Sequence, residues 1–270
     1  MSTDRVRIDI DEHGIAEVVM IRADKMNALD QAMFDALAGA IARLKTERGL
    51  RAVVLHGEGR AFCAGLDKGR FGKIASGADG GTRDLRARTH GIANSAQILG
   101  IGWRELPVPV VAAVQGAAFG GGLQLALGAD LRYITAETQL CVMEIKWGLV
   151  PDMAGMVLMR GLVRDDHLRE LTYTGRIVAG QEAVDLGLAT RVCADPLAEA
   201  RALARTLAGK SPSALRAAKR LLNQAHGSLD AGAAALLQAE SDEQVALMGR
   251  PHQVEAVRAN LENRPPVFVD

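Results

Sequence analysis

The sequence predicts an α/β core followed by a smaller helical unit at the C-terminus. Short apolar runs separated by helical patterns fill the chain to about residue 200, and the rest to Asn263 is almost wholly helical in its apolar spacing. An uncharged stretch, 108–129, carries a glycine triplet, Gly120–Gly122. The chain has 270 residues, of which 49% are hydrophobic, so it can bury one large core and such a unit.

The N-terminal part is predicted to form two strands, a helix and a third strand. Apolar residues alternate with polar ones at 6–10, and a second apolar run follows at 16–21, so a strand pair is expected. Apolar residues then recur at helical spacing over 33–44, with Asp30 as a plausible N-cap. The next strand is expected at 52–56.

The segment from Lys68 to Ser95 interrupts this pattern. Glycines and a serine fill its first half, and a basic helical pattern follows from Arg83 to Leu99. Two interpretations stay open, a lid or wall over a pocket and a plain surface insertion, because loops of either kind have the same composition.

The uncharged stretch 108–129 does not fit a membrane span. Pro109 and the neighbouring valines favour a strand, and three glycines would loosen a lipid-facing helix. A buried strand, a glycine turn and a helix from about Gly121 through Leu127 are therefore predicted. The glycines expose the backbone, and the first N–H groups of the helix lack partners, so an oxyanion could dock there. A tight turn without a ligand is the alternative.

Strands are expected at 131–135 and 139–143, and helices dominate the remainder. Ser211 and Pro212 are a typical N-cap and first residue for a helix. The apolar faces of the helices over 211–263 exceed what one small core needs, so we expect the subunits to bury them in trimers or hexamers.

Charge and cysteine content limit the partners. The chain has 32 Lys and Arg and 32 Asp and Glu, so nothing indicates nucleic acid or an acidic membrane surface. Cys63, Cys141 and Cys193 show neither CxxC nor metal-type spacing, so no metal site is expected and a reducing cytoplasm is indicated. Neither a secretory signal nor a peroxisomal address is expected at the ends.

Two strand ends followed by glycine carry the predicted chemistry, RAFCAGLD at 60–67 and AAFGGGLQ at 117–124. If both face one cleft, two backbone N–H groups could converge on one oxygen as an oxyanion hole for an acyl or enolate reaction. Cys63 as a nucleophile is the weaker interpretation, because a small buried residue is the commoner role.

These segments resemble the crotonase (enoyl-CoA hydratase/isomerase) superfamily. The matching segments are KMNAL, AFCAGLD, PVPVVAAVQGAAFGGGLQLALGADLRY, GLVPDMAG, TGRIVAGQEAVDLGLATRV, SPSALRAAKRLL and ENRPPVF. The resemblance implies a ββα superhelical core at 1–205 and a C-terminal helical oligomerisation region at 206–270, forming a homotrimer or homohexamer. It also implies a coenzyme A thioester as substrate, with no separate cofactor.

Matched position by position, the resemblance assigns the oxyanion hole to the N–H groups of Leu66 and Gly121. Contacts to coenzyme A, mostly through the backbone, are implied around Lys25, Ala28, Ala61, Cys63 and Ala64, with Lys25 or Arg22 near a phosphate. The family often places an aromatic residue of the C-terminal region on a neighbour's coenzyme A, and the matching residue here is Asn260.

The carboxylates decide which reaction follows. Hydratases of this family hold water between two glutamates, at positions matching Gln124 and Glu144. Gln124 can orient a water but cannot exchange a proton at neutral pH, whereas Glu144 can. Asp152 resembles the acidic partner of the dienoyl-CoA isomerase branch, although that branch usually has an aspartate at the position of Gln124. A packing role for Gln124 and a turn role for Asp152 are the alternatives.

The sequence therefore predicts double-bond isomerisation by Glu144 and Asp152, ahead of hydration by Glu144 alone. Which carboxyl is the base and which the acid stays open. A non-catalytic homologue that binds coenzyme A or RNA is the alternative from another class.

Overall fold

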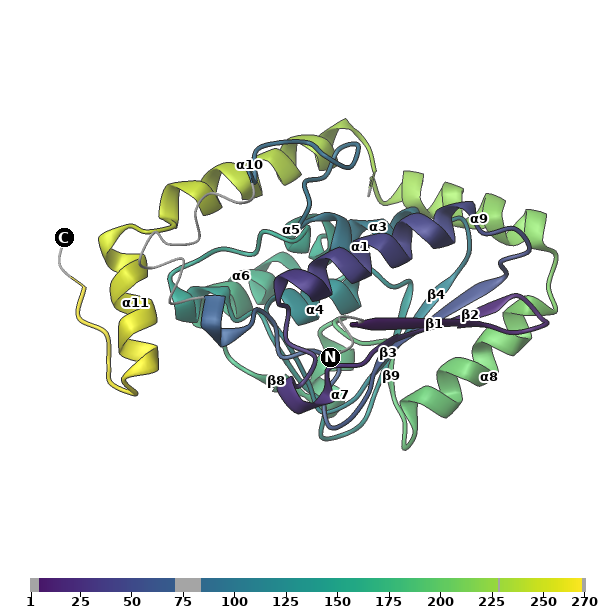
Figure 1. Ribbon diagram of the computed structural model, residues 1–270, viewed down its shortest axis with the longest axis horizontal. Coiled ribbons are helices and arrows are strands. Elements are labelled where there is room, and N and C mark those ends of the chain that lie inside the picture. The colour runs from purple at the N-terminus through teal and green to yellow at the C-terminus, as the bar shows by residue number, and fades with distance from the viewer. Residues whose placement is uncertain (1–4, 71–83, 228, 269–270) are drawn as a thin grey trace.

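The computed structural model describes residues 5–70, 84–227 and 229–268. Its centre is a six-stranded sheet (Figure 1) in the order β1 (Val6–Ile10), β2 (Ile15–Met20), β3 (Ala52–Gly57), β4 (Val110–Val114), β6 (Leu131–Ile134) and β9 (Arg191–Val192). β1 and β2 are antiparallel, and every later pair is parallel. The predicted α/β class is confirmed.

A second sheet lies beside the first and receives part of the same uncharged stretch. It has three strands in the order β5 (Ala117–Phe119), β7 (Gln139–Cys141) and β8 (Val178–Ala179). The prediction of one strand before the glycines was wrong, because Gly116 turns the backbone with φ +64° between β4 and β5. A Cβ at Gly116 would lie 1.9 Å from Arg60 O, so only glycine fits there.

Helices cover both faces of the main sheet, as Figure 1 shows. One face packs against α1 (Gln31–Thr46), α3 (Ile98–Glu105), α4 (Gly121–Leu127) and α5 (Gly155–Met159). The other face packs against α8 (Pro196–Ala208) through a separate cluster that includes Val54, Val111 and Ala200. Asp30 caps α1 by accepting a hydrogen bond from Met33 N at 2.8 Å, as predicted.

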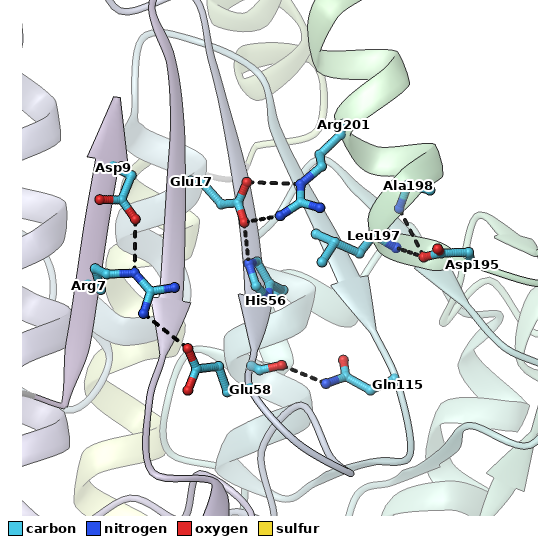
Figure 2. A network of polar contacts seen from close by, with 11 residues as sticks. Arg7, Asp9, Glu17, His56, Glu58, Gln115, Asp195, Leu197, Ala198 and Arg201 are labelled. Atoms are coloured by element: carbon cyan, nitrogen blue, oxygen red, sulfur yellow. Dashed lines mark hydrogen bonds and ion pairs between the residues drawn. The ribbon is translucent and has the colours of Figure 1, made fainter. Parts of the chain in front are cut away.

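A polar network joins α8 to the outer face of β2 and β3 (Figure 2). Glu17 is hydrogen-bonded to His56 Nε2 at 2.8 Å and accepts from Arg201 Nε at 3.0 Å. The hydrogen bond from Arg201, and then that from His56, lower the pKa of Glu17 despite partial burial. The network contributes to holding α8 on the sheet and lies apart from the site described below.

The shorter elements connect these layers. They are the 3₁₀ helices η1 (Ala23–Lys25) and η2 (Glu144–Trp147) and the α-helices α6 (Asp165–Thr174) and α7 (Gly180–Asp185).

Three helices complete the chain: α9 (Pro212–Ala225), α10 (Ala231–Leu247) and α11 (Pro251–Leu261). Ser211 caps α9 through a hydrogen bond from Ala214 N at 3.4 Å, as predicted. The predicted boundary at 205/206 falls inside α8, which packs on the main sheet. α10 contacts α5, and α11 contacts η2. In the described ranges, no helix is long and apolar enough to cross a membrane.

The helix predicted from Arg83 to Leu99 does not form in the part of it that the structure describes. Residues 84–97 are mostly turns, and α3 begins only at Ile98. The buried side chain of Asn94 accepts from the backbone N–H groups of Ala96 and Gln97, both at 2.8 Å, and so starts a new helix instead of continuing one. The first half of the predicted lid or insertion, 71–83, lies outside the described residues.

Candidate active site

The two predicted glycine turns lie next to each other. A parallel bridge joins Leu29 and Leu66, in which Leu29 N donates to Gly65 O at 2.8 Å and Asp67 N donates to Leu29 O at 3.1 Å. The N–H group of Leu66 therefore points away from Leu29. A second bridge joins Cys63 to Ala118, so the first turn also packs along β5.

Glycines allow this close approach. Gly65 has φ +85°, and a Cβ there would lie 2.5 Å from Phe119 O and 3.8 Å from Gly121 N. Gly121 is the first residue of α4, so its N–H has no partner within the helix. Among the described residues, neither Leu66 N nor Gly121 N has a backbone acceptor. Both residues line the same cavity, as the convergence of the two turns predicted.

Gly122 gives a direct test of this packing. A Cβ at Gly122 would lie 2.2 Å from Cys63 O, so Gly122→Ala must push the two turns apart. We expect a loss of about 1–3 kcal/mol or more in the free energy of unfolding. The displaced N–H pair should also lower kcat about 10²-fold. Denaturant unfolding and steady-state kinetics measure the two effects.

Gly39→Ala is the matched control. Gly39 is an exposed residue inside α1, and nothing lies within 4 Å of a Cβ built there. This variant should gain about 0.5–1 kcal/mol of stability at unchanged activity, because alanine is the better helix former. Equal behaviour of the two variants would contradict the packing described here.

The cavity has a volume of about 800 Å³ and combines apolar walls with charged groups. Its apolar residues include Leu29, Phe34, Leu85, Phe119, Trp147, Leu149, Met153 and Met248. Its carboxyls are Glu144 and Asp152, and its cationic residues are Lys68, Arg70, Lys146 and Arg264. Such a cavity can hold an apolar chain beside two acids and an anionic group beside the cations.

Glu144 begins η2, and its two carboxyl oxygens differ in their surroundings. Its Oε1 accepts a hydrogen bond from Gln124 Nε2 at 2.6 Å. Its Oε2 is buried and has no hydrogen-bond partner among the described residues. Burial raises the pKa of Glu144 to about 7, and the nearby charge of Asp152 adds to the effect. The carboxyl can therefore gain or lose a proton near neutral pH.

Asp152 lies in the same cavity and is partly exposed to it. Burial raises its pKa to about 7, although a hydrogen bond with Gln244 works in the opposite direction. Gln244 is fixed in turn, because its Oε1 accepts from Val150 N at 3.2 Å. The site thus holds two carboxyls that both titrate near neutrality.

The segment after Asp152 is held by α10. Glu240 is buried, and its carboxyl accepts from Ala154 N at 3.0 Å and from Met156 N at 2.9 Å. It also accepts from Gln97 Nε2 at 3.1 Å. Glu240 and Gln244 therefore make the C-terminal helix part of the support of this site.

Gln124 is buried behind Glu144 and is held by protein partners. Its side chain is 2% exposed and is absent from the cavity lining in the described part of the chain. Its Oε1 accepts from Met153 N at 2.8 Å and from Gly155 N at 2.9 Å, and its Nε2 donates to Glu144. The amide of Gln124 is therefore buried and occupied by protein partners, and its role in catalysis stays a prediction.

The predicted coenzyme A contacts are only partly brought to the cavity. Ala64 lines it, whereas Ala28 and Ala61 are buried and Lys25 is exposed outside the lining. Cys63 is fully buried, its Sγ donates to Asn27 O at 3.2 Å, and burial raises its pKa to about 12, which excludes a thiolate at neutral pH.

Arg22, predicted as an alternative to Lys25 near a phosphate, is paired with carboxylates. Its guanidinium lies 2.7 Å from Asp67 and 3.5 Å from Asp30, and it is mostly buried. Two carboxylates thus share the charge of this cation, and its contact with a phosphate stays a prediction.

Sequence reasoning missed the cationic residues of the cavity and the contribution of α10 and α11. Lys68 and Lys146 are exposed, and exposed lysines have no distinguishing pattern in a sequence. Asn260 lines the cavity of its own chain and donates to Lys146 O at 2.5 Å. A polar residue on a helix carries no sign of which distant segment it will meet.

Comparisons with known proteins agree with this architecture. Residues 11–270 match the family model described as enoyl-CoA hydratase/isomerase. A Bacillus subtilis protein named "Probable enoyl-CoA hydratase" is 31% identical over 93% of this chain and 94% of its own length. The mitochondrial methylglutaconyl-CoA hydratase of Mus musculus is 29% identical over 98% of this chain and 82% of its own length.

Solved structures show the same fold. The crystal structure of an enoyl-CoA hydratase/isomerase from Mycobacterium paratuberculosis superposes with a TM-score of 0.83 at 29% identity, covering 96% of this chain and 98% of that one. The fold and its relatives define the class of protein, an enzyme of the crotonase superfamily. Within that class the chain belongs to the enoyl-CoA hydratase/isomerase family.

Proposed function

We propose that the protein transfers protons on the acyl chain of a coenzyme A thioester, through an enolate held by the N–H groups of Leu66 and Gly121. One observation carries the proposal. Two backbone N–H groups without backbone acceptors among the described residues and two carboxyls with a pKa of about 7 line one cavity. The N–H pair stabilises negative charge on the thioester oxygen, and the carboxyls supply the base and the acid.

The reaction we favour is isomerisation of a double bond, of the dienoyl-CoA type. One carboxylate removes a proton from the acyl chain, and the electron pair moves into the conjugated system and onto the thioester oxygen. The second carboxyl then protonates a carbon farther along the chain, and the oxygen returns its electrons. No atom is gained or lost, and the two carboxyls exchange their protonation states. Glu144 and Asp152 are the pair that this reaction needs.

Hydration of a 2-enoyl-CoA is the second candidate, because the relatives named above include hydratases. A water must be activated and a proton delivered to the carbon next to the thioester. Glu144 would do this in the proposed reaction, but Gln124 cannot act as a second acid or base. Hydration by Glu144 without a second glutamate should therefore be slow.

The exposed lysines of the cavity are the proposed contacts for the phosphates of coenzyme A. Lys68 and Lys146 are both exposed and line the cavity that holds the carboxyls. Ala64 lies in the same lining and offers its backbone. A soluble thioester ligand and a homo-oligomer remain the expected partners.

Exchange of the proton next to the thioester tests the core of this proposal without assuming the product. In D₂O, a saturated acyl-CoA should gain deuterium at the α carbon when the protein is present, because enolate formation alone permits exchange. Binding of acyl-CoA without exchange, or salt-sensitive binding of RNA without binding of acyl-CoA, would favour a non-catalytic homologue instead.

Isomerisation by this pair predicts a bell-shaped dependence of kcat on pH. The reaction needs one carboxyl ionised and the other protonated, and both have a pKa of about 7. We expect a maximum of kcat near pH 7. Well below and well above this pH, kcat should fall tenfold per pH unit, because the base is protonated at low pH and the acid is ionised at high pH. Steady-state rates from pH 5 to 9 with a dienoyl-CoA measure this. A flat profile would contradict the assignment.

The same pair should make stability depend on pH. The pKa values of Glu144 and Asp152 are raised above their ordinary values of 4.5 and 3.8. Because the folded state holds these protons more tightly, the stabilisation is present below about pH 4 and is lost as the pH rises through 7. In the variant that combines Glu144→Gln and Asp152→Asn, the free energy of unfolding should no longer show this decrease with rising pH. Denaturant unfolding at several pH values measures it.

A further inference from the structure

The amide of Gln124 has only one orientation that satisfies its neighbours. Its oxygen accepts from two backbone N–H groups, those of Met153 and Gly155, at 2.8 and 2.9 Å. A flipped amide would set its NH₂ group against both donors and its oxygen against Glu144. The N–H side of the amide must therefore face Glu144.

This orientation makes the two oxygens of Glu144 unequal. Oε1 is occupied by the amide N–H of Gln124 at 2.6 Å, while Oε2 is buried without a partner in the described structure. An unpaired buried oxygen costs free energy, so its persistence beside a cavity indicates a place for a ligand group. A proton on Oε1 would point at the N–H donor of Gln124, whereas Oε2 makes no hydrogen bond in the described structure.

The same amide joins the two acid-bearing segments. Gln124 belongs to α4, Glu144 begins η2, and Met153 directly follows Asp152. One side chain thus spans from the first carboxyl to the backbone next to the second. A Cβ at Gly155 would lie 2.6 Å from Gln124 Oε1, so the glycine at 155 is needed for this contact.

We propose that Gln124 is a positioning residue that confines proton exchange to Oε2 of Glu144 and fixes the distance between Glu144 and Asp152. The proposal rests on the proposed function for the identity of the reaction, and on the hydrogen bonds alone for the orientation of Glu144. Gln124 acts through Glu144 and does not touch the substrate.

Gln124→Glu is the sharper test, because it preserves an acceptor for the two backbone N–H groups and removes the donor to Glu144. The new carboxyl would face Oε1 of Glu144, and two adjacent carboxyls retain a shared proton to higher pH. The apparent pKa of Glu144 should rise by about one unit or more. Carbon NMR of ¹³C-labelled glutamate follows this titration, with the signal assigned through Glu144→Gln.

Gln124→Met tests positioning with a side chain of similar size and no polar amide. The lost donor should raise the pKa of Glu144, and the loosened carboxyl should lower kcat about 10- to 100-fold at a nearly unchanged KM. The control is Gln181→Met on α7, because Gln181 also donates its amide to a carboxylate, Asp185, at 2.9 Å, but it is exposed and remote from the cavity. Its kinetics and pH profile should equal those of the wild type.

The NMR titration keeps this proposal separate from the proposed function. If the wild-type protein proves inactive toward the thioesters tested, the titration of Glu144 in the Gln124 variants still decides the positioning role. An unchanged titration in Gln124→Glu overturns the proposal, whether or not Gln124→Met remains folded. A shifted titration together with a kcat loss in Gln124→Met establishes it.

Discussion

Replacing Glu144 with glutamine is expected to lower kcat by about 10²- to 10⁴-fold, the usual contribution of one general acid or base. An amide cannot take up or deliver the proton at neutral pH, yet it has nearly the same volume and still offers an oxygen to Gln124 Nε2. The fold and the KM should change little. Loss of a buried ionisable group whose pKa is raised to about 7 should keep the stability equal or increase it.

The steady-state rate and the rate of deuterium exchange should both fall in this variant if Glu144 abstracts the proton next to the thioester. If Glu144 is instead the acid, turnover falls while exchange continues. The matched control is Glu137→Gln, an exposed residue on the turn before β7, which should behave as wild type. Turnover of Glu144→Gln within threefold of the wild type would remove Glu144 from the mechanism.

Asp152→Asn is expected to separate the two candidate reactions. Isomerisation needs a second proton-transfer group, so conversion of a 3,5-dienoyl-CoA should fall by about 10²- to 10⁴-fold. Hydration of crotonyl-CoA by Glu144 does not need Asp152 and should keep most of its slow rate. Asparagine preserves the size of the side chain, and its oxygen can still accept the hydrogen bond from Gln244.

Both substrates must therefore be assayed in parallel, by dienoyl absorbance and by loss of the crotonyl double bond. Fast hydration of crotonyl-CoA that survives Asp152→Asn would overturn the preference for isomerisation. Inactivity of the wild-type protein toward both substrates, with α-proton exchange intact, would instead direct the search to another acyl chain.

Local chemistry made part of the fold predictable. Asp30 and Ser211 are caps that act within three residues, and both were found where the sequence placed them. The helix predicted from Gly121 through Leu127 has those bounds, because the glycines and the apolar run define it locally. The missed helix start at Ile98 has a local cause as well, since the side chain of Asn94 competes with helical hydrogen bonding.

The site was less predictable because its parts meet over long distances in the sequence. An amide such as that of Gln124 cannot exchange a proton at neutral pH, and the sequence shows this. Only the structure shows that its oxygen accepts hydrogen bonds from the backbone N–H groups of Met153 and Gly155. The pairing of Arg22 with Asp67 joins residues far apart in the sequence, and charge patterning alone could not distinguish it from a free cation. The cavity walls supplied by α10 and α11 depend on packing angles that no local pattern encodes.

The position of Glu240 and Gln244 in the chain has a consequence for how the protein is made. The residues of the sheet and of the glycine turns are synthesised before those of the last helices. They can therefore bury their apolar faces before these helices have left the ribosome. The segment that bears Asp152 acquires its hydrogen bonds to Glu240 and Gln244 only after α10 emerges. The sheet and the turns can therefore form before the proposed site has its full support, and that support is completed last.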